Sequence, residues 1–280
     1  MRGGTLYVVA TPLGHLGDLT ARAAALLRAV PVVAAEDTRR SRILLQHLDA
    51  RPRLLSYHAH SGSGATETIL SVLASGEDVA LVTDAGTPGI SDPGAALVAR
   101  VRAAGHAIVP LPGPSAVTTA LSAAGFPADR YVFLGFVPRK GAERGRLLER
   151  AGREGWTTVY FEAPGRVREL LEDLAAACGE DRRAVVAREL TKMHEELRAG
   201  TLGELLTFYA EGEDAVRGEC TVVVEGAPET AEPEDEGRMK RAAARLIAAG
   251  ISRRETASLL AELFGVPRNT AYKLAVETKE

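Results

Sequence analysis

The sequence predicts an α/β protein made of two lobes with a ligand cleft between them, followed by a small helical module. Short apolar runs of strand length alternate with helical apolar spacing through the first 227 residues. The stretch 228–237 then carries five acids and no base, and 238–280 carries nine Lys and Arg against four Asp and Glu. We therefore expect an N-terminal α/β lobe at 1–118, a second α/β lobe at 119–227, an acidic linker at 228–237 and a basic helical module at 238–280.

Three strand-loop-helix units occupy the first 125 residues. The strands are LYVVA at 6–10, VAL at 79–81 and AIVPL at 107–111, and each is followed by an unusual loop and then by a helical pattern. A fourth strand, PVVAA at 31–35, leads into EDTRRSR. Because the carboxyl ends of parallel strands meet at one edge of a sheet, we expect these loops to gather there, where they could share one ligand.

The loop VTDAGTPGISDPG at 82–94 contains three glycines, two prolines and two aspartates. A turn accounts for one Gly and one Pro, but a loop this long and this rich in them is more typical of a binding site. Glycine also lets the backbone approach a ligand closely. We interpret this segment as a ligand-binding loop.

The second half of the chain has an α/β pattern as well. TTVYF and RAVVAREL are predicted strands, the helix RVRELLEDLAAACG between them ends at Gly179, and a helix over LGELLTFYA and a strand within GECTVVVEGA follow. Ahead of these elements, Tyr131, Phe133 and Phe136 either stack on nucleobases or, more commonly, are buried between the lobes. A cleft between two α/β lobes is the natural place for a ligand.

The C-terminal module is predicted to be helical. Ser252 with Glu255 forms a capping box, Gly265 ends that helix, and Pro267 opens another. The spacing of small residues around this turn resembles a helix-turn-helix. Such a hairpin either contacts nucleic acid or merely packs, and both interpretations stay open.

The bulk composition is that of a globular protein, with 46% apolar residues, 25% charged residues and a net charge of -3. Cys178 and Cys220 fit no disulfide framework or metal spacing, which favours a reducing cytoplasm and predicts no metal site. The run LYVVA is too short for a signal peptide core, and no apolar run reaches the length of a membrane span. We expect a cytoplasmic protein without a membrane partner.

The motifs of several enzyme classes are absent. No G-x-G-x-x-G opens the first unit, and the sequence contains no P-loop, no G-x-S-x-G elbow and no H-E-x-x-H helix. What remains is a cradle of backbone and small side chains. That cradle suits a cofactor that carries the reactive group itself.

Six segments form a specific combination. They are TPLGHLGD (11–18), AAEDTR (34–39), DAGTPGISDPG (84–94), LPGPSA (111–116), ARELTK (187–192) and GE (218–219). Together they resemble the tetrapyrrole-methylase superfamily and, within it, the branch that methylates small-subunit ribosomal RNA. The resemblance covers nearly the whole chain, and it departs from the usual pattern at His15, at 61–64 and at Gly165.

The resemblance implies a homodimeric, two-lobed enzyme that binds S-adenosylmethionine in the cleft between the lobes. It implies transfer of the methyl group to the ribose 2′-oxygen of one cytidine in the decoding region of 16S rRNA, either as RNA or in the small ribosomal subunit. By the same resemblance, the cofactor contacts are Leu13, Gly14, Asp84, Ala85, Gly86, Ser115, Ala116 and Ala187.

Methyl transfer from a sulfonium depends mainly on holding the reacting atoms collinear and dry, but a base helps because a ribose hydroxyl is a poor nucleophile. The candidate catalytic residues are Asp37, Glu36, His58, Glu189 and Lys192. Each has a structural alternative. Asp37 could cap the following helix, His58 could be a satisfied loop histidine, and Glu189 with Lys192 could form an ordinary ion pair.

Two basic clusters are candidate RNA contacts, because neutralising phosphates dominates affinity for RNA. They are Arg39, Arg40 and Arg42, and Arg139, Lys140, Arg144 and Arg146. Short Arg runs also occur on solvated helix faces. Two other functions stay open: a methylase of a small tetrapyrrole, for which the AEDTR element and the basic tail are not needed, and a regulator that responds to S-adenosylmethionine and binds nucleic acid through the tail.

Overall fold

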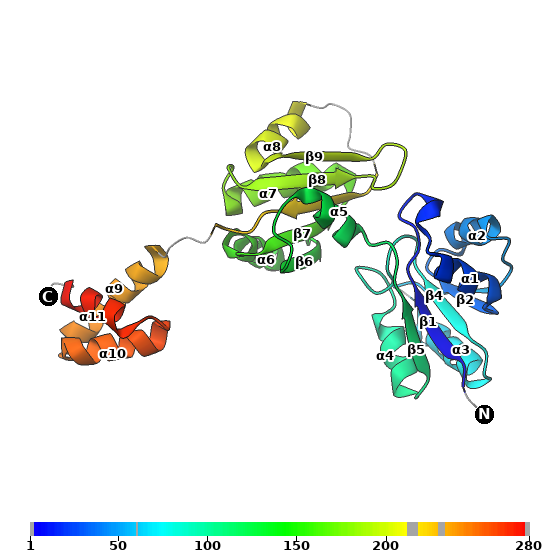
Figure 1. Ribbon diagram of the computed structural model, residues 1–280, viewed down its shortest axis with the longest axis horizontal. Coiled ribbons are helices and arrows are strands. Elements are labelled where there is room, and N and C mark those ends of the chain that lie inside the picture. Colours follow the sequence, from blue (N-terminus) through cyan, green and yellow to red (C-terminus); the bar gives the residue numbers. More distant parts are fainter. Residues whose placement is uncertain (1–2, 60, 212–217, 229–232, 278–280) are drawn as a thin grey trace. The chain divides into compact units, whose positions relative to one another are not determined.

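The computed structural model describes residues 3–59, 61–211, 218–228 and 233–277. The chain divides into two compact units, 1–227 and 228–280 (Figure 1). The first unit contains two sheets, and the second contains helices α9 to α11. Among the described residues, no helix is both long and apolar enough to cross a membrane.

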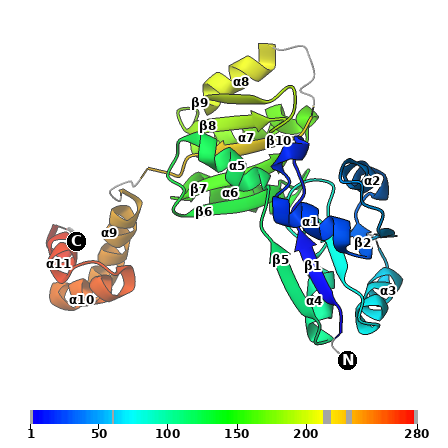
Figure 2. The ribbon, with the colours of Figure 1, turned by 45° about the vertical axis from the view of Figure 1, so that its right-hand side comes forward.

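The first sheet is parallel, with the strand order β3-β2-β4-β1-β5 (Figures 1 and 2). Its strands are β1 (Thr5–Val9), β2 (Val32–Ala35), β3 (Arg53–Ser56), β4 (Val79–Val82) and β5 (Ala107–Leu111). The three predicted strand-loop-helix units supply β4, β1 and β5, which are neighbours in the sheet. Their loops therefore leave one edge side by side, as expected.

Helices cover both faces of this sheet. Along β2, Val33 and Ala35 pack with α1 and α2, whereas Val32 and Ala34 pack with α3 and α4, because successive strand side chains point to opposite faces. Burial on both faces explains why β2 and β4 are wholly apolar. The helices are α1 (Ala21–Ala29), α2 (Thr38–His47), α3 (Ser63–Ala74) and α4 (Ala95–Ala103), with a 3-10 turn η1 (Leu16–Asp18) ahead of α1.

The second sheet is mixed, with the strand order β6-β7-β10-β8-β9. Its strands are β6 (Tyr131–Phe136), β7 (Thr157–Glu162), β8 (Arg183–Arg188), β9 (Glu196–Thr201) and β10 (Cys220–Val224), and only the β6/β7 pair is parallel. One face packs on α7 (Val167–Cys178) through Leu170, Leu171 and Leu174, which share a stripe at helical spacing. The other helices of this lobe are α6 (Ala142–Arg153), α8 (Leu202–Glu211) and the 3-10 turn η2 (Pro164–Arg166).

Helix α5 (Ala116–Ala124) joins the two lobes. It follows β5 of the first sheet, yet Val117, Ala120 and Leu121 pack against the second sheet beside Val159 and Val223. The expected lobe boundary after residue 118 therefore falls inside a helix. The apolar face of α5 is what anchors the loop at 112–115 to the second lobe.

The C-terminal unit consists of α9 (Pro233–Ala248), α10 (Arg253–Phe264) and α11 (Arg268–Glu277) around a core that includes Met239 and Leu260. Ser252 caps α10 by accepting a hydrogen bond from the Glu255 amide, and Gly265 ends the helix with a left-handed backbone, as predicted. Within the expected linker at 228–237, 229–232 lie outside the described residues. The backbone from Pro233 onward is helical, because the fixed φ of proline suits the first position of a helix.

Candidate functional site

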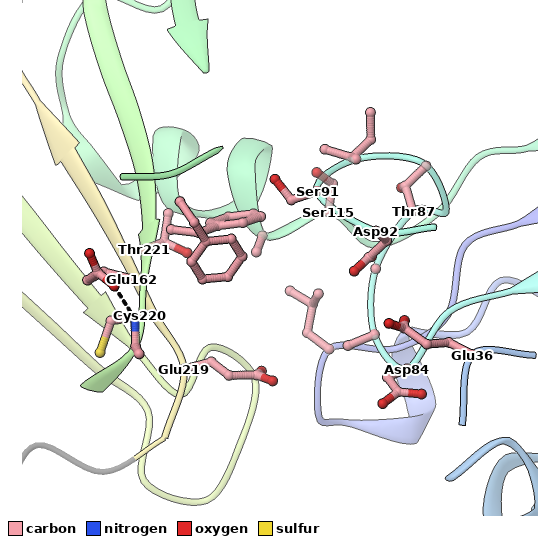
Figure 3. A pocket seen from close by; sticks show the side chains of 18 of the residues that line it. Glu36, Asp84, Thr87, Ser91, Asp92, Ser115, Glu162, Glu219, Cys220 and Thr221 are labelled. Atoms are coloured by element: carbon pink, nitrogen blue, oxygen red, sulfur yellow. Dashed lines mark hydrogen bonds between the residues drawn. The ribbon is translucent and has the colours of Figure 1, made fainter. Parts of the chain in front are cut away.

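A cavity of about 400 Å³ lies between the lobes of the first unit (Figure 3). The first lobe supplies residues from the ends of β1, β2, β4 and β5 and from the start of α5, and the second supplies residues from β6, β7 and β10. A volume of this size suits a small ligand. The cavity lies at the edge of the first sheet where the sequence predicted a shared binding site.

Backbone contacts join the loops that form this edge. Thr11 and Gly86 exchange N–H···O=C hydrogen bonds of 2.9 and 3.0 Å, which link the loop after β1 to the loop after β4. The Thr87 hydroxyl donates to the carbonyl of Pro114 at 3.1 Å, which links the β4 loop to the β5 loop. The three loops therefore form one wall of the cavity.

The β4 loop needs glycine at specific points. Gly86 and Gly89 have φ of +79° and +84°, a region that L side chains rarely adopt. Gly86 also lines the cavity, so its missing side chain leaves backbone exposed to a ligand. These two positions account for the glycines that a simple turn did not explain.

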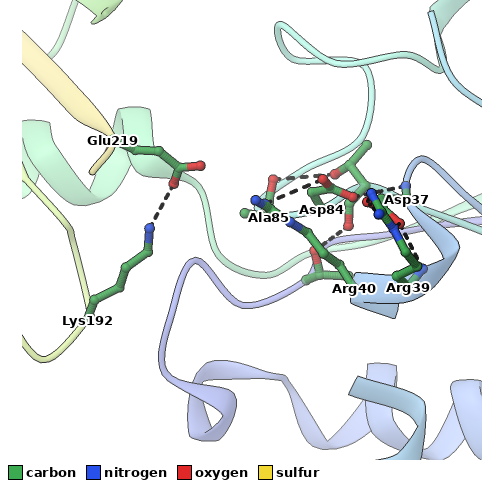
Figure 4. Close-up of polar contacts among 9 residues, drawn as sticks. Asp37, Arg39, Arg40, Asp84, Ala85, Lys192 and Glu219 are labelled. Carbon is green, nitrogen blue, oxygen red and sulfur yellow. Dashed lines mark hydrogen bonds and ion pairs between the residues drawn. The ribbon is translucent and has the colours of Figure 1, made fainter. Parts of the chain in front are cut away.

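Asp84 holds the loop after β2 in place. One of its carboxylate oxygens accepts the Asp37 amide at 3.0 Å, and the other lies 3.4 Å from the Arg40 guanidinium (Figure 4). Asp84 and Arg40 both line the cavity. The side chain is therefore a scaffold for the AEDTR segment as well as a part of the cavity wall.

Two further carboxyl groups of the first lobe, Glu36 and Asp92, face the same cavity (Figure 3). Burial and the charge of Asp84 raise the pKa of Glu36 above its usual value. Burial and the charge of Glu36 raise the pKa of Asp92 to about 7. A positively charged ligand would relieve both the burial cost and the mutual repulsion of these carboxylates.

The second lobe contributes an aromatic and partly acidic wall. Phe136 and Phe161 line the cavity with their ring centroids 5.7 Å apart in an edge-to-face arrangement. Glu162 and Glu219 add carboxyl groups, of which Glu162 is buried and Glu219 exposed. Cys220 also lines the cavity, but burial raises the pKa of its thiol to about 12, so it is not a thiolate nucleophile.

The ARELTK segment forms an ion-pair network near the cavity. Lys192 Nζ lies 2.8 Å from Glu189 Oε1 and 3.1 Å from Glu219 Oε2 (Figure 4). Burial alone would lower the pKa of Lys192, but its hydrogen bond to Glu189 and the charge of Glu219 raise it. Lys192 therefore stays protonated and cannot accept a proton near neutral pH. Glu189 is held by the same network and is not part of the cavity wall.

Six of the eight predicted cofactor contacts line the cavity: Leu13, Asp84, Ala85, Gly86, Ser115 and Ala116. Gly14 does not. It lies against Lys192, where an added Cβ would overlap the lysine side chain. Ala187 is 1% exposed in the core between the second sheet and α5, so its side chain does not reach the cavity.

Of the predicted catalytic residues, Glu36 alone is in the cavity wall. Asp37 caps α2 by accepting the Arg39 amide at 2.8 Å, and hydrogen bonds from Arg39 lower its pKa to about 2. Such a carboxylate is a weak base, so the helix-cap alternative describes Asp37. His58 is exposed on the loop after β3, away from the cavity wall.

The two basic clusters differ. Arg39, Arg40 and Arg42 are exposed on α2, although Arg39 pairs with Asp37 and Arg40 with Asp84. Arg139, Lys140 and Arg146 are exposed as well.

Arg144 is a wrong prediction. It is 8% exposed, its Nε donates to Asp173 at 2.7 Å and its Nη1 donates to the Pro138 carbonyl at 2.9 Å. Its Nη2 pairs electrostatically with Asp173 and Glu169 but lacks hydrogen-bond geometry to either. Arg144 holds α6 to α7, because one side of the α6 helix faces the core, and it is not available to a phosphate.

Several residues of the cavity were missed from the sequence. Asp92 lies inside the predicted binding loop, so its position in that loop was a usable signal. Glu162 and Phe136 lie at the ends of strands of the second sheet, and Phe136 is 56% exposed rather than buried between the lobes. Nothing in the local pattern distinguishes these two from core residues.

Comparisons with known proteins agree on one family. Residues 5–206 match the family of Tetrapyrrole (Corrin/Porphyrin) Methylases. The chain is 44% identical to "Ribosomal RNA small subunit methyltransferase I" of Escherichia coli O157:H7, over 98% of this chain and 95% of that protein. It is 42% identical to the protein of the same name from Synechocystis sp., over 98% of each chain.

Solved structures share the fold at low sequence identity. The methyltransferase CobJ aligns with a TM-score of 0.62 and 21% identity, over 80% of this chain and 95% of that one. Uroporphyrin-III C-methyltransferase from Thermus thermophilus, complexed with S-adenosylhomocysteine, aligns with a TM-score of 0.58 and 20% identity, over 79% of this chain and 97% of that one. At these identities the likeness concerns the fold alone.

Proposed function

Because the chain belongs to the tetrapyrrole methylase family, in the group of ribosomal RNA small subunit methyltransferases I, we propose that it methylates small-subunit ribosomal RNA with S-adenosylmethionine. The observation that carries this proposal is the acidic cavity formed by the predicted binding loops. A substrate in the ribosomal subunit would place the enzyme in the cytoplasm.

The cavity suits S-adenosylmethionine chemically. Glu36, Asp84 and Asp92 would attract the sulfonium and the amino group of the cofactor. The start of α5, where the Ser115 hydroxyl makes no cap hydrogen bond, offers a helix N-terminus to the carboxylate of the cofactor. Leu13 and Ala116 supply apolar surface beside these groups.

When bound, S-adenosylmethionine supplies an electrophilic methyl group. The protein's own contribution is to hold the acceptor oxygen in line with that methyl and to exclude water, which the wall of interlinked loops suits. We assign the proton of the acceptor hydroxyl to the carboxylate pair Glu36 and Asp92. Both groups line the cavity, and their raised pKa values make them better bases than ordinary carboxylates.

Substitution of the two neighbouring acids of the AEDTR segment tests this assignment. Glu36→Gln should lower kcat by roughly 10²-fold or more, because it removes half of the proton-accepting pair. Asp37→Asn is the matched control, since Asp37 caps α2 outside the cavity, and it should keep nearly full turnover. Equal losses in both variants at unchanged cofactor affinity would count against the pair.

The finer substrate assignment is the ribose 2′-oxygen of one cytidine in the decoding region. We would incubate the protein with labelled S-adenosylmethionine and unmodified small subunits, and then map ribose methylation by resistance to alkaline cleavage. One protected cytidine is the expected result. Cofactor binding without transfer to subunits or RNA would favour a small-molecule methylase or a regulator.

RNA contact is proposed for the exposed cations Arg42, Arg139, Lys140 and Arg146, and for the C-terminal unit. Deleting 238–280 should weaken RNA binding and leave cofactor binding intact, since that unit has its own core. Loss of all nucleic-acid binding would favour a regulator instead. Homodimerisation stays a proposal from family membership, and sedimentation equilibrium would test it.

A further inference from the structure

Glu162 is a buried carboxylate with an unused oxygen. It is 2% exposed at the end of β7. Its Oε1 accepts the Ala163 amide at 2.8 Å and lies 3.2 Å from the Arg166 guanidinium, so the charge is balanced. Its Oε2 is buried and has no hydrogen-bond partner among the residues that the structure describes. Leaving such an acceptor unsatisfied is costly, which points to a partner supplied by a ligand.

The unused oxygen belongs to the cavity wall, beside two aromatic rings (Figure 3). Phe161 precedes Glu162 on β7, and Phe136 lies on the neighbouring strand β6. A bulge between Phe133 and Gly135, with Gly135 at φ +63°, shifts the register just before Phe136. The cavity therefore combines flat apolar surface with a hydrogen-bond acceptor that cannot donate.

The rim next to Phe136 is basic. Phe136 is 56% exposed although it lines the cavity, and the exposed cations Arg139 and Lys140 follow it by three and four residues. An exposed aromatic ring beside cations is the usual surface for a splayed-out nucleotide of RNA. The wall of the first lobe, with its carboxylates and the start of α5, is where the cofactor fits.

We propose that Phe136 and Glu162 form the pocket for the target base, and that Glu162 Oε2 accepts a hydrogen bond from the exocyclic amino group of cytosine. This inference rests on the proposed function, since it takes the occupant to be a cytidine of ribosomal RNA. Carboxylates are suited to the cytosine N4 amine. Uracil presents an oxygen at the same position, so a buried carboxylate rejects it by repulsion.

The substitution Glu162→Gln separates recognition of the base from binding of the cofactor. Glutamine has the same shape, but its amide can either accept from the cytosine amine or donate to the uracil oxygen. Wild-type protein should methylate subunits with cytidine at the mapped site and largely spare subunits reconstituted with uridine there. E162Q should lower kcat/KM for cytidine roughly tenfold, shrink the preference for cytidine over uridine and leave the Kd for S-adenosylmethionine unchanged.

Glu169→Gln is the matched control. Glu169 also faces Arg166, at 3.8 Å, but its side chain is half exposed and does not line the cavity, so its loss should leave the preference intact. Phe136→Ala provides a second measurement that does not depend on burying a new group. Because the ring is exposed, folding should be unaffected, whereas kcat/KM for RNA should fall roughly tenfold through lost stacking at an unchanged cofactor Kd.

Three outcomes would overturn the inference while leaving the proposed function in place. One is an unchanged cytidine preference in E162Q. Another is a weaker S-adenosylmethionine Kd in E162Q, which would assign the acceptor to the adenine amine of the cofactor. The third is full activity of F136A. Absence of methyl transfer by the wild-type protein would instead refute the proposed function.

Discussion

Asp92 should release a proton when S-adenosylmethionine binds. It lines the cavity, and burial together with the charge of Glu36 raises its pKa to about 7, so near neutral pH it is only partly ionised. A sulfonium in the same cavity stabilises the ionised carboxylate. Cofactor binding and ionisation of Asp92 are then linked, and each favours the other.

The size of the effect follows from the position of this pKa. With a value of about 7, the unliganded protein carries about 0.9 proton on Asp92 at pH ~6 and about 0.1 at pH ~8. If the complex holds Asp92 ionised, binding at the lower pH must expel that proton. The Kd for S-adenosylmethionine should therefore fall about tenfold from pH ~6 to pH ~8.

Isothermal titration calorimetry measures both quantities. Titrations at pH ~6 in buffers with different ionisation enthalpies give the number of protons released. Asp92→Asn should abolish the release and flatten the pH dependence. S-adenosylhomocysteine, which lacks the sulfonium charge, should show a weaker dependence on the wild-type protein. Zero proton release, or a pH dependence that survives in D92N, would refute the coupling.

Further expectations concern stability and the cavity network. Because the folded-state pKa of Asp92 is raised, the cost of ionising it is absent below pH ~4 and complete above pH ~7. D92N should therefore stabilise the unliganded protein by about 1 kcal/mol at pH ~8 in urea unfolding, after allowance for solvent screening, and should have no effect at pH ~4. Gly218→Ala should reduce activity, since Gly218 has φ +86° and an added Cβ would overlap the Glu189 carboxyl group; normal kinetics would mean that the Lys192 network is dispensable. Arg144→Ala should cost about 2 kcal/mol in urea unfolding, whereas an effect confined to RNA binding would contradict its burial. Leu170→Ala, a fully buried position against the second sheet, should cost about 3 kcal/mol.

Local pattern was sufficient for most of the fold. Apolar runs placed β1, β4 and β5, and the caps at Ser252 and Gly265 were legible because each depends on neighbours within a few residues. Strands β3, β6 and β9 were not predicted. They alternate in exposure or include Gly and charged residues, so their pairing with neighbours rather than their own composition makes them strands.

The candidate site divides in the same way. The loops after β1, β4 and β5 were predicted to share a ligand, because the positions of strand ends follow from the topology of a parallel sheet. Which side chains face that ligand was not predictable. Asp37 and Glu36 are adjacent in sequence, yet one caps a helix and the other lines the cavity.

The sequence by itself determined the two α/β lobes, the separate basic helices and the loops that bind, since these depend on periodicity, capping and glycine. Only the tertiary structure decided that Arg144 is buried, that Asp92 and Glu36 share a cavity, and that Glu162 keeps an unused oxygen there. Burial and electrostatic coupling arise between residues far apart in the chain. They exist only once the second sheet and α5 close over the loops of the first.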